Sequence, residues 1–307
     1  MEVLISTFVM SIGLLGLAAL IPVGRFAIVQ TGKSDRAGAC GRAGLRDVKV
    51  RRMLDYQYWL PAQDAQSKNI PPFAIDPLGV ANGMGGSLGP IPRLYLIYTA
   101  NEEAAKQIFL WQDDKIFHVP DDANLRTRAQ YTHPVSGAPM DENIGSDGIP
   151  AVTGYYSWLA TVVPSPAEAN VTLAEKSQFT VSIVVCYDRN YNTAPTPTDP
   201  AGETVTQATF IGSAGQTISP GGGSVQLAQK VKVRENDWIM LYSAGPPVQC
   251  KWYRVVAAGE NPTNLVSLAG PDWSLAAGPT ATAVIIDSVV GVYTSAMELD
   301  NDPLWRR

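Results

Sequence analysis

The sequence predicts an α+β protein, in which a long N-terminal helix, transmembrane in its first part, carries a large antiparallel β-rich head domain. Three observations lead to this prediction. Residues 3–21 contain no charged side chain. Residues 35 to about 58 alternate small, apolar and basic residues as an amphipathic helix does. From Tyr155 onward, short apolar runs rich in Val, Thr and Tyr are separated by Gly and Pro, a pattern typical of strands and turns.

The apolar run defines the first expected element, a transmembrane helix over residues 1–24. A helix rises 1.5 Å per residue, so this run is about long enough to cross the ~30 Å hydrocarbon core of a bilayer. Its only polar side chains are hydroxyls, which can bond back to the preceding turn of a helix. Pro22 and Gly24 weaken the helix where the run stops, and Arg25 is the first cation after it.

Glu2 lies at the edge of the apolar run and has two interpretations. A carboxylate at a helix N-terminus is favourable, because the first amide groups lack partners and carry partial positive charge. Alternatively, Glu2 meets a positive charge in apolar surroundings, where pairing matters most.

The segment E-V-L-I-S-T-F-V-M-S-I-G-L-L-G-L-A-A-L resembles the N-terminal segment of type IV prepilins and pseudopilins, and it is most similar to the minor-pilin pattern. The resemblance covers about the first 25 residues. It implies that a prepilin peptidase removes a leader, that the new N-terminus is methylated, and that the helix first anchors the chain in the membrane and then forms the core of a filament. It also implies that Glu2 pairs with the terminal ammonium of a neighbouring pilin subunit. The expected helix-packing residues are Gly13, Gly16 and Pro22.

The distribution of cations bears on orientation. Cytoplasmic flanks of membrane helices carry excess Lys and Arg. The N-terminal flank has none, whereas five cations follow the helix between Arg25 and Arg46. This distribution by itself would leave the large C-terminal part inside. Either the chain never had a processing site, or a basic leader upstream of Met1 restores the pilin orientation, and the charges favour the leader. With that orientation, the resemblance implies a single-pass protein of the bacterial inner membrane, with an extracytoplasmic head in the periplasm or, after assembly, at the cell surface.

Residues 25–60 are expected to continue the helix after an interruption at Thr31–Ser34. Ser34 is a plausible N-cap, and Pro61 ends the helix. One face carries small or apolar residues, which let another backbone approach closely, so this face is expected to pack on the head. Basic residues lie on another face. The small and apolar residues are Ala37, Gly41, Gly44, Leu45 and Val48, and the basic ones are Arg42, Arg46 and Lys49.

Residues 61–150 are predicted to be a loop-rich, mixed α/β part of the head. Gly85, Ser87 and Gly89 match G-x-S-x-G formally, but a nucleophile elbow needs a strand before it and a helix after it. Gly-rich coil precedes this match, and two prolines follow it. The acidic residues of positions 121–147 match no EF-hand spacing. His118 and His133 stand in no recognisable base or ligand spacing. We therefore expect no catalytic site, metal or cofactor.

Residues 151–307 are predicted to form an antiparallel β-sandwich-like domain with eight candidate strands between Tyr155 and Leu299. Trp238, Trp252, Tyr253 and Trp273 are expected to dominate its core, and an aromatic glycan-binding groove is the alternative. Cys186 and Cys250 both lie in strand-like runs. They either form one disulfide outside the cytoplasm or are small buried apolar residues, and Cys40 is left free on the helix.

These patterns predict a pilin-like or pseudopilin-like structural subunit that assembles with other subunits. The alternative is a singly anchored extracytoplasmic binding module, perhaps for carbohydrate, that forms no filament. An anchored hydrolase is disfavoured because no nucleophile–base constellation is present. The net charge is −5, and no basic patch is interleaved with aromatic residues, so nucleic acid is not an expected partner.

Overall fold

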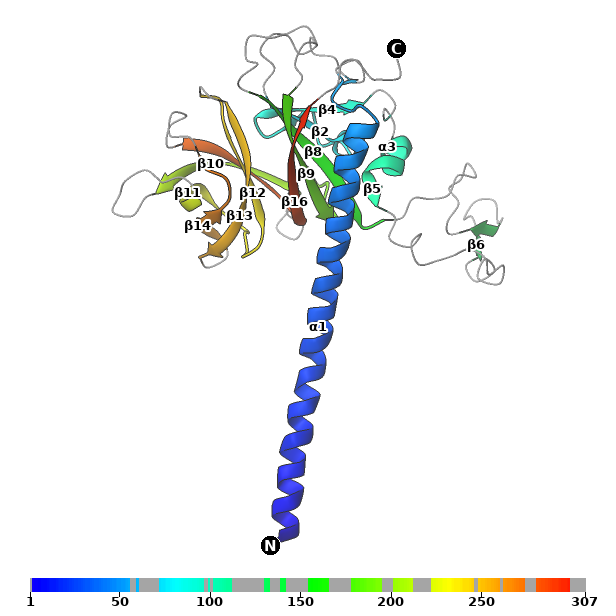
Figure 1. The fold of residues 1–307 in the computed structure, drawn as a ribbon, viewed down its shortest axis with the longest axis vertical. Coiled ribbons are helices and arrows are strands. Elements are labelled where there is room, and N and C mark those ends of the chain that lie inside the picture. The colour runs from blue at the N-terminus through cyan, green and yellow to red at the C-terminus, as the bar shows by residue number, and fades with distance from the viewer. Residues whose placement is uncertain are drawn as a thin grey trace.

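The computed structural model describes residues 2–55, 59–60, 72–96, 99, 102–111, 130–132, 139–141, 154–165, 178–194, 201–211, 222–245, 248–259, 262–273 and 280–298. Helix α1 (Glu2–Val50) projects from a head that combines a mixed sheet with a closed barrel (Figure 1). The other described helices are short, α2 (Pro77–Ala81) and α3 (Glu102–Phe109). The described fold is mainly β, so the predicted α+β class with an antiparallel head is wrong.

Helix α1 is one continuous helix, and the interruption predicted at Thr31–Ser34 does not occur. Pro22 lies inside it, and the Thr31 hydroxyl donates to the Ala27 carbonyl at 2.9 Å, which keeps Thr31 within the helical pattern. A glycine costs a helix only about 1 kcal/mol, so Gly32 does not break it. The helix ends at Val50, earlier than expected, in a turn where Arg52 has a φ of +52°.

Among the described residues, no helix combines the length and the apolar character needed to cross a membrane. The side chains of residues 2–6, 9, 12 and 15–19 lie outside this description. Beyond them, α1 carries Arg25, Lys33 and Asp35, and charged side chains oppose insertion at a cost of about 2.5–3.5 kcal/mol each near a helix centre. This finding contradicts the predicted transmembrane helix over residues 1–24 and the predicted single-pass location in the inner membrane.

The mixed sheet collects strands from distant parts of the chain. Its order is β1 (Trp59–Leu60), β4 (Ile91–Leu96), β2 (Phe73–Ile75), β8 (Tyr156–Pro164), β9 (Gln178–Tyr187) and β16 (Val289–Glu298). Strand β3 (Ser87–Leu88) pairs with β4, and β5 (Leu110–Trp111) pairs with β8. Strands β2 and β4 run parallel, so the sheet is not wholly antiparallel. It unites strands from both sides of the boundary expected at residues 150/151.

The barrel lies between β9 and β16 in the chain. Its order is β10 (Glu203–Ile211), β11 (Gly222–Val231), β14 (Thr263–Ala269), β13 (Gln249–Ala258), β12 (Trp238–Ser243) and β15 (Thr280–Ile286), with β15 closing on β10. A separate pair joins β6 (Gln130–Thr132) to β7 (Pro139–Asp141). A turn at Asp287 and Ser288, where Ser288 has a φ of +65°, separates β15 from β16. Strand β15 belongs to the barrel and β16 to the mixed sheet, so the predicted sandwich is replaced by a barrel and a sheet.

Strand β8 explains why the sheet forms the middle layer of the head. It is buried along most of its length, and its side chains alternate between two apolar clusters. Trp158 and Ala160 pack in the cluster that includes α1 and α3, whereas Leu159 packs in the cluster shared with the barrel. A third cluster fills the barrel and includes Tyr253 and Trp273.

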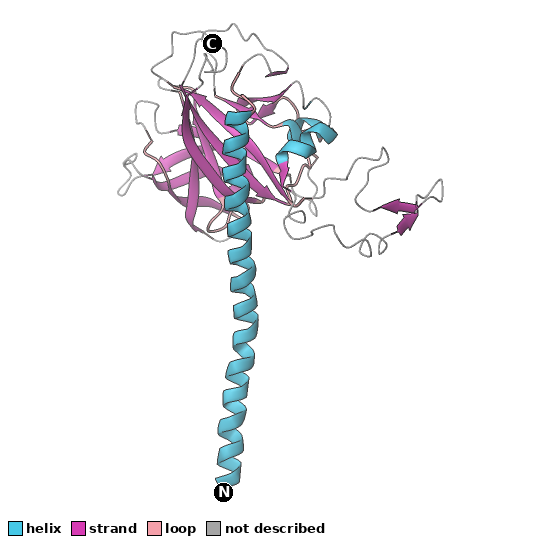
Figure 2. Ribbon diagram, turned by 45° about the vertical axis from the view of Figure 1, so that its right-hand side comes forward, coloured by secondary structure: helices cyan, strands magenta, loops and turns pink. Residues whose placement is uncertain are grey.

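The C-terminal half of α1 packs closely on the sheet, as the small-residue face predicted (Figure 2). A Cβ placed on Gly41 would lie 2.1 Å from the Tyr293 ring of β16. A Cβ on Gly44 would lie 2.9 Å from Ile183 and 3.2 Å from Trp158. The glycines therefore allow the helix backbone to rest directly on large side chains of the sheet.

Replacing Gly41 with Ala should destabilise the protein, because the new methyl group would overlap the Tyr293 ring unless the helix or the ring moves. Overpacking of this kind costs about 1–3 kcal/mol, more than the gain in helix propensity of about 1 kcal/mol. Urea unfolding of the full chain, followed by tryptophan fluorescence, measures the difference.

Gly32→Ala is the matched control, because no atom lies within 4 Å of its added Cβ. This variant should be as stable as the wild type or slightly more stable. Equal unfolding midpoints for the two variants would contradict the packing described for Gly41.

Candidate functional site

The N-terminal half of α1 extends beyond the head and exposes large apolar side chains (Figure 1). We call residues 8–29 the shaft. Phe26 is 71% exposed and Ile28 74% exposed, although both are large and apolar. The exposed large hydrophobic residues of the shaft are Phe8, Met10, Leu14, Leu20, Ile21, Val23, Phe26, Ile28 and Val29.

Apolar surface of this extent is unfavourable in water, at about 25 cal/mol per Å². Scattered exposed hydrophobic residues are normal, but contiguous ones mark an interaction surface. The exposed residues occur on every side of the shaft, whereas the described contacts of α1 with the head lie in its C-terminal half. The shaft is therefore the part of the described chain whose apolar side chains would gain most from burial against a partner surface.

A cluster of tyrosines holds α1 where it leaves the head. The Lys33 ammonium lies 4.3 Å from the centre of the Tyr187 ring, a cation–π contact. Tyr187 in turn stacks on Tyr155 at 5.9 Å and contacts the Tyr156 ring edge-on at 5.0 Å. These contacts fix the direction in which the shaft projects.

The predicted assembly residues have different outcomes. The side chain of Glu2 and the surroundings of Gly16 lie outside the described part of the structure. Gly13 is exposed, with nothing within 4 Å of a Cβ placed on it, and Pro22 is exposed within α1. Both described positions therefore lie on the free surface of the shaft.

The three cysteines are buried, and none of them forms a disulfide. Cys186 and Cys250 share the apolar cluster between sheet and barrel, so the structure has the small-apolar alternative rather than the disulfide. Burial raises the pKa of both thiols to about 12, which keeps them protonated. Cys40 is buried on the face of α1 that packs in the cluster with the sheet.

Within the described ranges, the other chemical motifs do not converge on a reactive site. Ser87 is exposed in the β3–β4 hairpin, where Gly85 and Gly89 have positive φ, and this is not a nucleophile elbow. Trp252, Tyr253 and Trp273 are at most 5% exposed, so these three belong to the core and not to a surface groove. The two histidines and the acidic residues of positions 121, 122, 142 and 147 lie outside the described residues.

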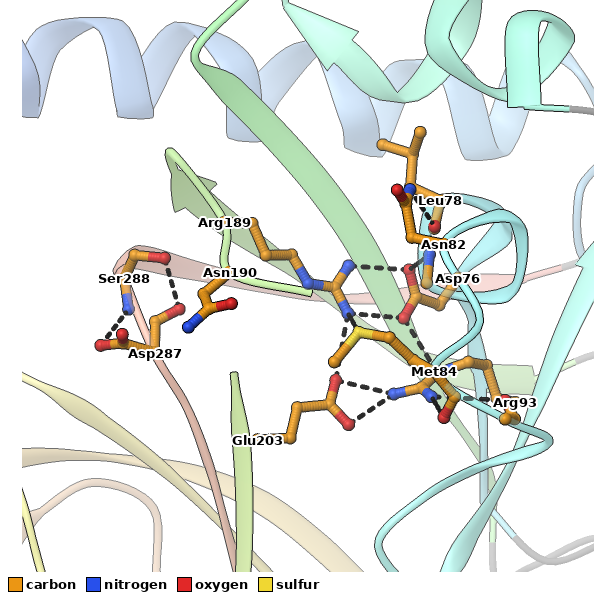
Figure 3. A network of polar contacts seen from close by, with 12 residues as sticks. Asp76, Leu78, Asn82, Met84, Arg93, Arg189, Asn190, Glu203, Asp287 and Ser288 are labelled. Atoms are coloured by element: carbon orange, nitrogen blue, oxygen red, sulfur yellow. Dashed lines mark hydrogen bonds and ion pairs between the residues drawn. The ribbon is translucent and has the colours of Figure 1, made fainter. Parts of the chain in front are cut away.

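A buried ion network, which the sequence interpretation missed, joins the sheet to the barrel (Figure 3). It consists of Asp76, Arg93, Arg189 and Glu203. Asp76 follows β2 and caps α2, Arg93 lies in β4, Arg189 follows β9, and Glu203 begins β10. The four positions lie far apart in the sequence, and no spacing signals that they meet.

The two arginines bridge the two carboxylates. Arg189 donates to both Asp76 oxygens, at 2.8 and 2.7 Å, and to Glu203 at 3.1 Å. Arg93 donates from one amino nitrogen to both Glu203 oxygens, at 2.7 and 2.6 Å, and its Nε lies 2.9 Å from Asp76 Oδ2. Arg93 also donates to the Met84 carbonyl at 2.7 Å. Two positive and two negative charges balance, so the network is held together without net charge.

Asp76 is fully buried and accepts a further hydrogen bond from the Gly79 amide at 3.0 Å. Burial by itself would raise the pKa of Asp76, but the Arg189 and Arg93 guanidinium groups outweigh it and hold the pKa below its usual value. The ionised carboxylate therefore stabilises the folded state, and the network fixes the barrel against the sheet.

Replacing Asp76 with Asn should lower the free energy of unfolding by about 3–5 kcal/mol, because two buried arginines then lose a charged partner. Asn can still accept the Gly79 bond as a helix cap, so the change isolates the charge. Urea unfolding at pH 7 measures the loss, and the exposed Asp272→Asn should stay within about 0.5 kcal/mol of wild type.

The pH dependence of the free energy of unfolding tests the role of the Asp76 charge in a second way. A lowered folded-state pKa means that the stabilisation is present above the unfolded pKa of about 3.9 and is lost as the pH falls below it. Wild-type stability should therefore fall more steeply than that of Asp76→Asn between about pH 5 and pH 2. Parallel curves for the two proteins would contradict the role of Asp76.

Comparison with protein-family models, curated proteins and solved structures finds no match to this chain. Among the described residues, no group of three or more His, Cys, Asp or Glu side chains is placed to hold a metal ion. The shaft of α1 is thus the feature of the described structure that bears most directly on function.

Proposed function

We propose that this chain is a structural subunit of a filament of the type IV pilin or pseudopilin kind. In the filament, the shaft of α1 packs against the α1 helices of neighbouring subunits, and the head lies outside this helical core. The observation that carries the proposal is the exposed apolar surface between Phe8 and Val29, on a helix whose other half is fixed to the head.

The arrangement of α1 supports this proposal in a second way. A helix that only linked two domains would not need apolar side chains on every side. The shaft displays them all round, and a helix surrounded by other helices in a bundle would bury them all. The continuous helix and the Lys33–Tyr187 contact hold the shaft in one direction, which reduces the entropy lost on assembly.

The sequence of the helix supports the same class of function. The segment from Glu2 to Leu20 resembles the N-terminal segment of type IV prepilins and pseudopilins, whose helices form filament cores. Other pilin-like subunits are the expected partners, and a prepilin peptidase would be a further partner if a leader precedes Met1.

Replacing Phe26 and Ile28 with Gln should prevent assembly and leave the head folded. Burial of two such side chains is worth about 1.5–3 kcal/mol each, so the double variant should assemble on the order of 100-fold less well. Pelleting and negative-stain electron microscopy of the full-length protein measure assembly, and tryptophan fluorescence checks the fold.

Val256→Gln serves as the control, because Val256 is also exposed and apolar but lies on the barrel. This variant should assemble like the wild type. The proposed function is wrong if the wild type forms no filament, or if the double variant in the shaft assembles as well as Val256→Gln.

Glu2→Ala should impair assembly without altering the fold of the head. In a helix bundle, an ammonium group left without its carboxylate partner would cost several kcal/mol before relaxation, on the order of the penalty for an unpaired buried charge. Recovery of wild-type and variant protein in sheared filaments measures the effect. Equal recovery would remove Glu2 from the assembly contact but would leave the contribution of the shaft intact.

A further inference from the structure

We propose that subunits of this chain bind head to tail through charge. The cationic stripe of one copy, Arg42, Arg46 and Lys49 on α1, contacts the acidic corner of the next copy, Asp188 and Asp287. This inference rests on the proposed function and specifies how neighbouring heads are placed.

The cationic stripe lies on the side of α1 opposite its buried positions, and of its three side chains Arg42 reaches back toward the Tyr293 hydroxyl of β16. Its residues are spaced by four and three positions, so they share one face of the helix. The buried positions Ala37, Cys40, Gly41, Gly44 and Val48 form the opposite face. All three cations are exposed, and no ion pair joins them to a carboxylate within the described part of the chain. In Figure 2 the upper part of α1 crosses in front of the strands of the head.

The stripe continues one of the apolar faces of the shaft. Counting back from Arg42 by seven residues at a time reaches Asp35, Ile28 and Ile21, since two turns of helix take about seven residues. Ile28 and Ile21 are both exposed. A neighbouring subunit that packs along this face therefore meets apolar side chains first, then the carboxylate of Asp35, and then the cations.

The charge of the chain is divided between its two parts. Of the 23 Lys and Arg and the 28 Asp and Glu, residues 1–55 hold eight and four, which leaves 15 and 24 for the rest. The helical part thus carries a formal charge of +4 and the remainder −9. Opposite net charges on two parts of one chain favour contact between the helix of one copy and the head of another.

The acidic corner lies at the end of the head from which the shaft emerges. Asp188 follows Tyr187, whose ring contacts Lys33. Asp287 lies on the adjacent turn, where the Ser288 hydroxyl donates to the Asp188 carbonyl at 3.3 Å. Both acidic side chains are exposed. They are bound to no described cation, although Arg189 of the ion network lies next to Asp188 in the chain.

The two surfaces lie at different heights along α1. Lys33 marks the level of the acidic corner, and Arg46 lies thirteen residues further along the helix, which corresponds to about 20 Å. Parallel copies displaced by about this distance would bring the corner of one beside the stripe of another. Because the two surfaces differ, the contact is heterologous and can repeat without closing, as a filament requires.

The test is a charge-reversal experiment on the full-length protein, with assembly measured by pelleting over a range of NaCl concentrations. Replacing Arg42, Arg46 and Lys49 with Glu should raise the critical concentration about tenfold at low salt, and high salt should reduce the difference by screening. The control replaces Lys230, Lys232 and Arg234, three exposed cations of the barrel region, with Glu. It changes the net charge equally and should assemble like the wild type.

A double-mutant cycle identifies the partner surface. Asp188→Asn and Asp287→Asn should together weaken assembly, and Asn tolerates the positive φ of +53° at position 188. If the two surfaces contact each other, neutralising Arg42, Arg46 and Lys49 with Gln should add little further loss in the Asn variant. Additive losses would overturn the pairing.

Other outcomes would also overturn the inference. If the stripe variant assembles like the wild type, or the barrel control loses as much, no specific stripe contact exists. If the stripe variant instead loses binding to phosphatidylglycerol vesicles with unchanged assembly, the stripe recognises an anionic surface of another kind. Failure of the wild type to assemble at any salt concentration would overturn the proposed function as well.

Discussion

The close contact between α1 and the mixed sheet is the constraint on which the rest of the described structure depends. Gly41 has no side chain where the Tyr293 ring lies, and Gly44 leaves room for Ile183 and Trp158. One half of the helix is thereby fixed to the head along its buried face. Because a helix is stiff along its axis, the other half is then forced to project away from the head, where its apolar side chains have no partner within the described residues.

The ion network gives the head a similar constraint on the barrel side. The barrel is an insertion between β9 and β16, so both chain connections to it leave the sheet at one end. The cluster shared by sheet and barrel is apolar and therefore not directional. The paired arginines and carboxylates are directional, and the Trp252 indole adds a hydrogen bond to Thr161 at 3.0 Å. Together these polar contacts fix one orientation of the barrel, which places the acidic corner relative to α1.

The sequence interpretation found elements whose signal is local. The small-residue face of α1 follows from a spacing of three and four residues, and many of the later strands follow from alternation between turn residues. It failed where local signals compete with longer-range packing. The Gly and Ser of Thr31–Ser34 predict an interruption, yet the helix continues through it. Residues 61–150 are predicted to be rich in loops, yet residues 73–88 contain β2, α2 and β3, because short strands can form when neighbouring strands supply their hydrogen bonds.

What the sequence by itself determined is the helix with its small-residue face and apolar first part, and the β-rich character of the later chain, because both depend on residue patterns within one element. Only the tertiary structure decided which strands pair, that a barrel replaces the expected sandwich, and that Asp76, Arg93, Arg189 and Glu203 meet. Those outcomes depend on contacts between residues far apart in the chain: Asp76 and Arg189 are 113 positions apart, and the paired residues Gln178 and Glu298 are 120 positions apart. No pattern within a single element specifies a contact of that separation, since its free energy arises only once the other layers are in place.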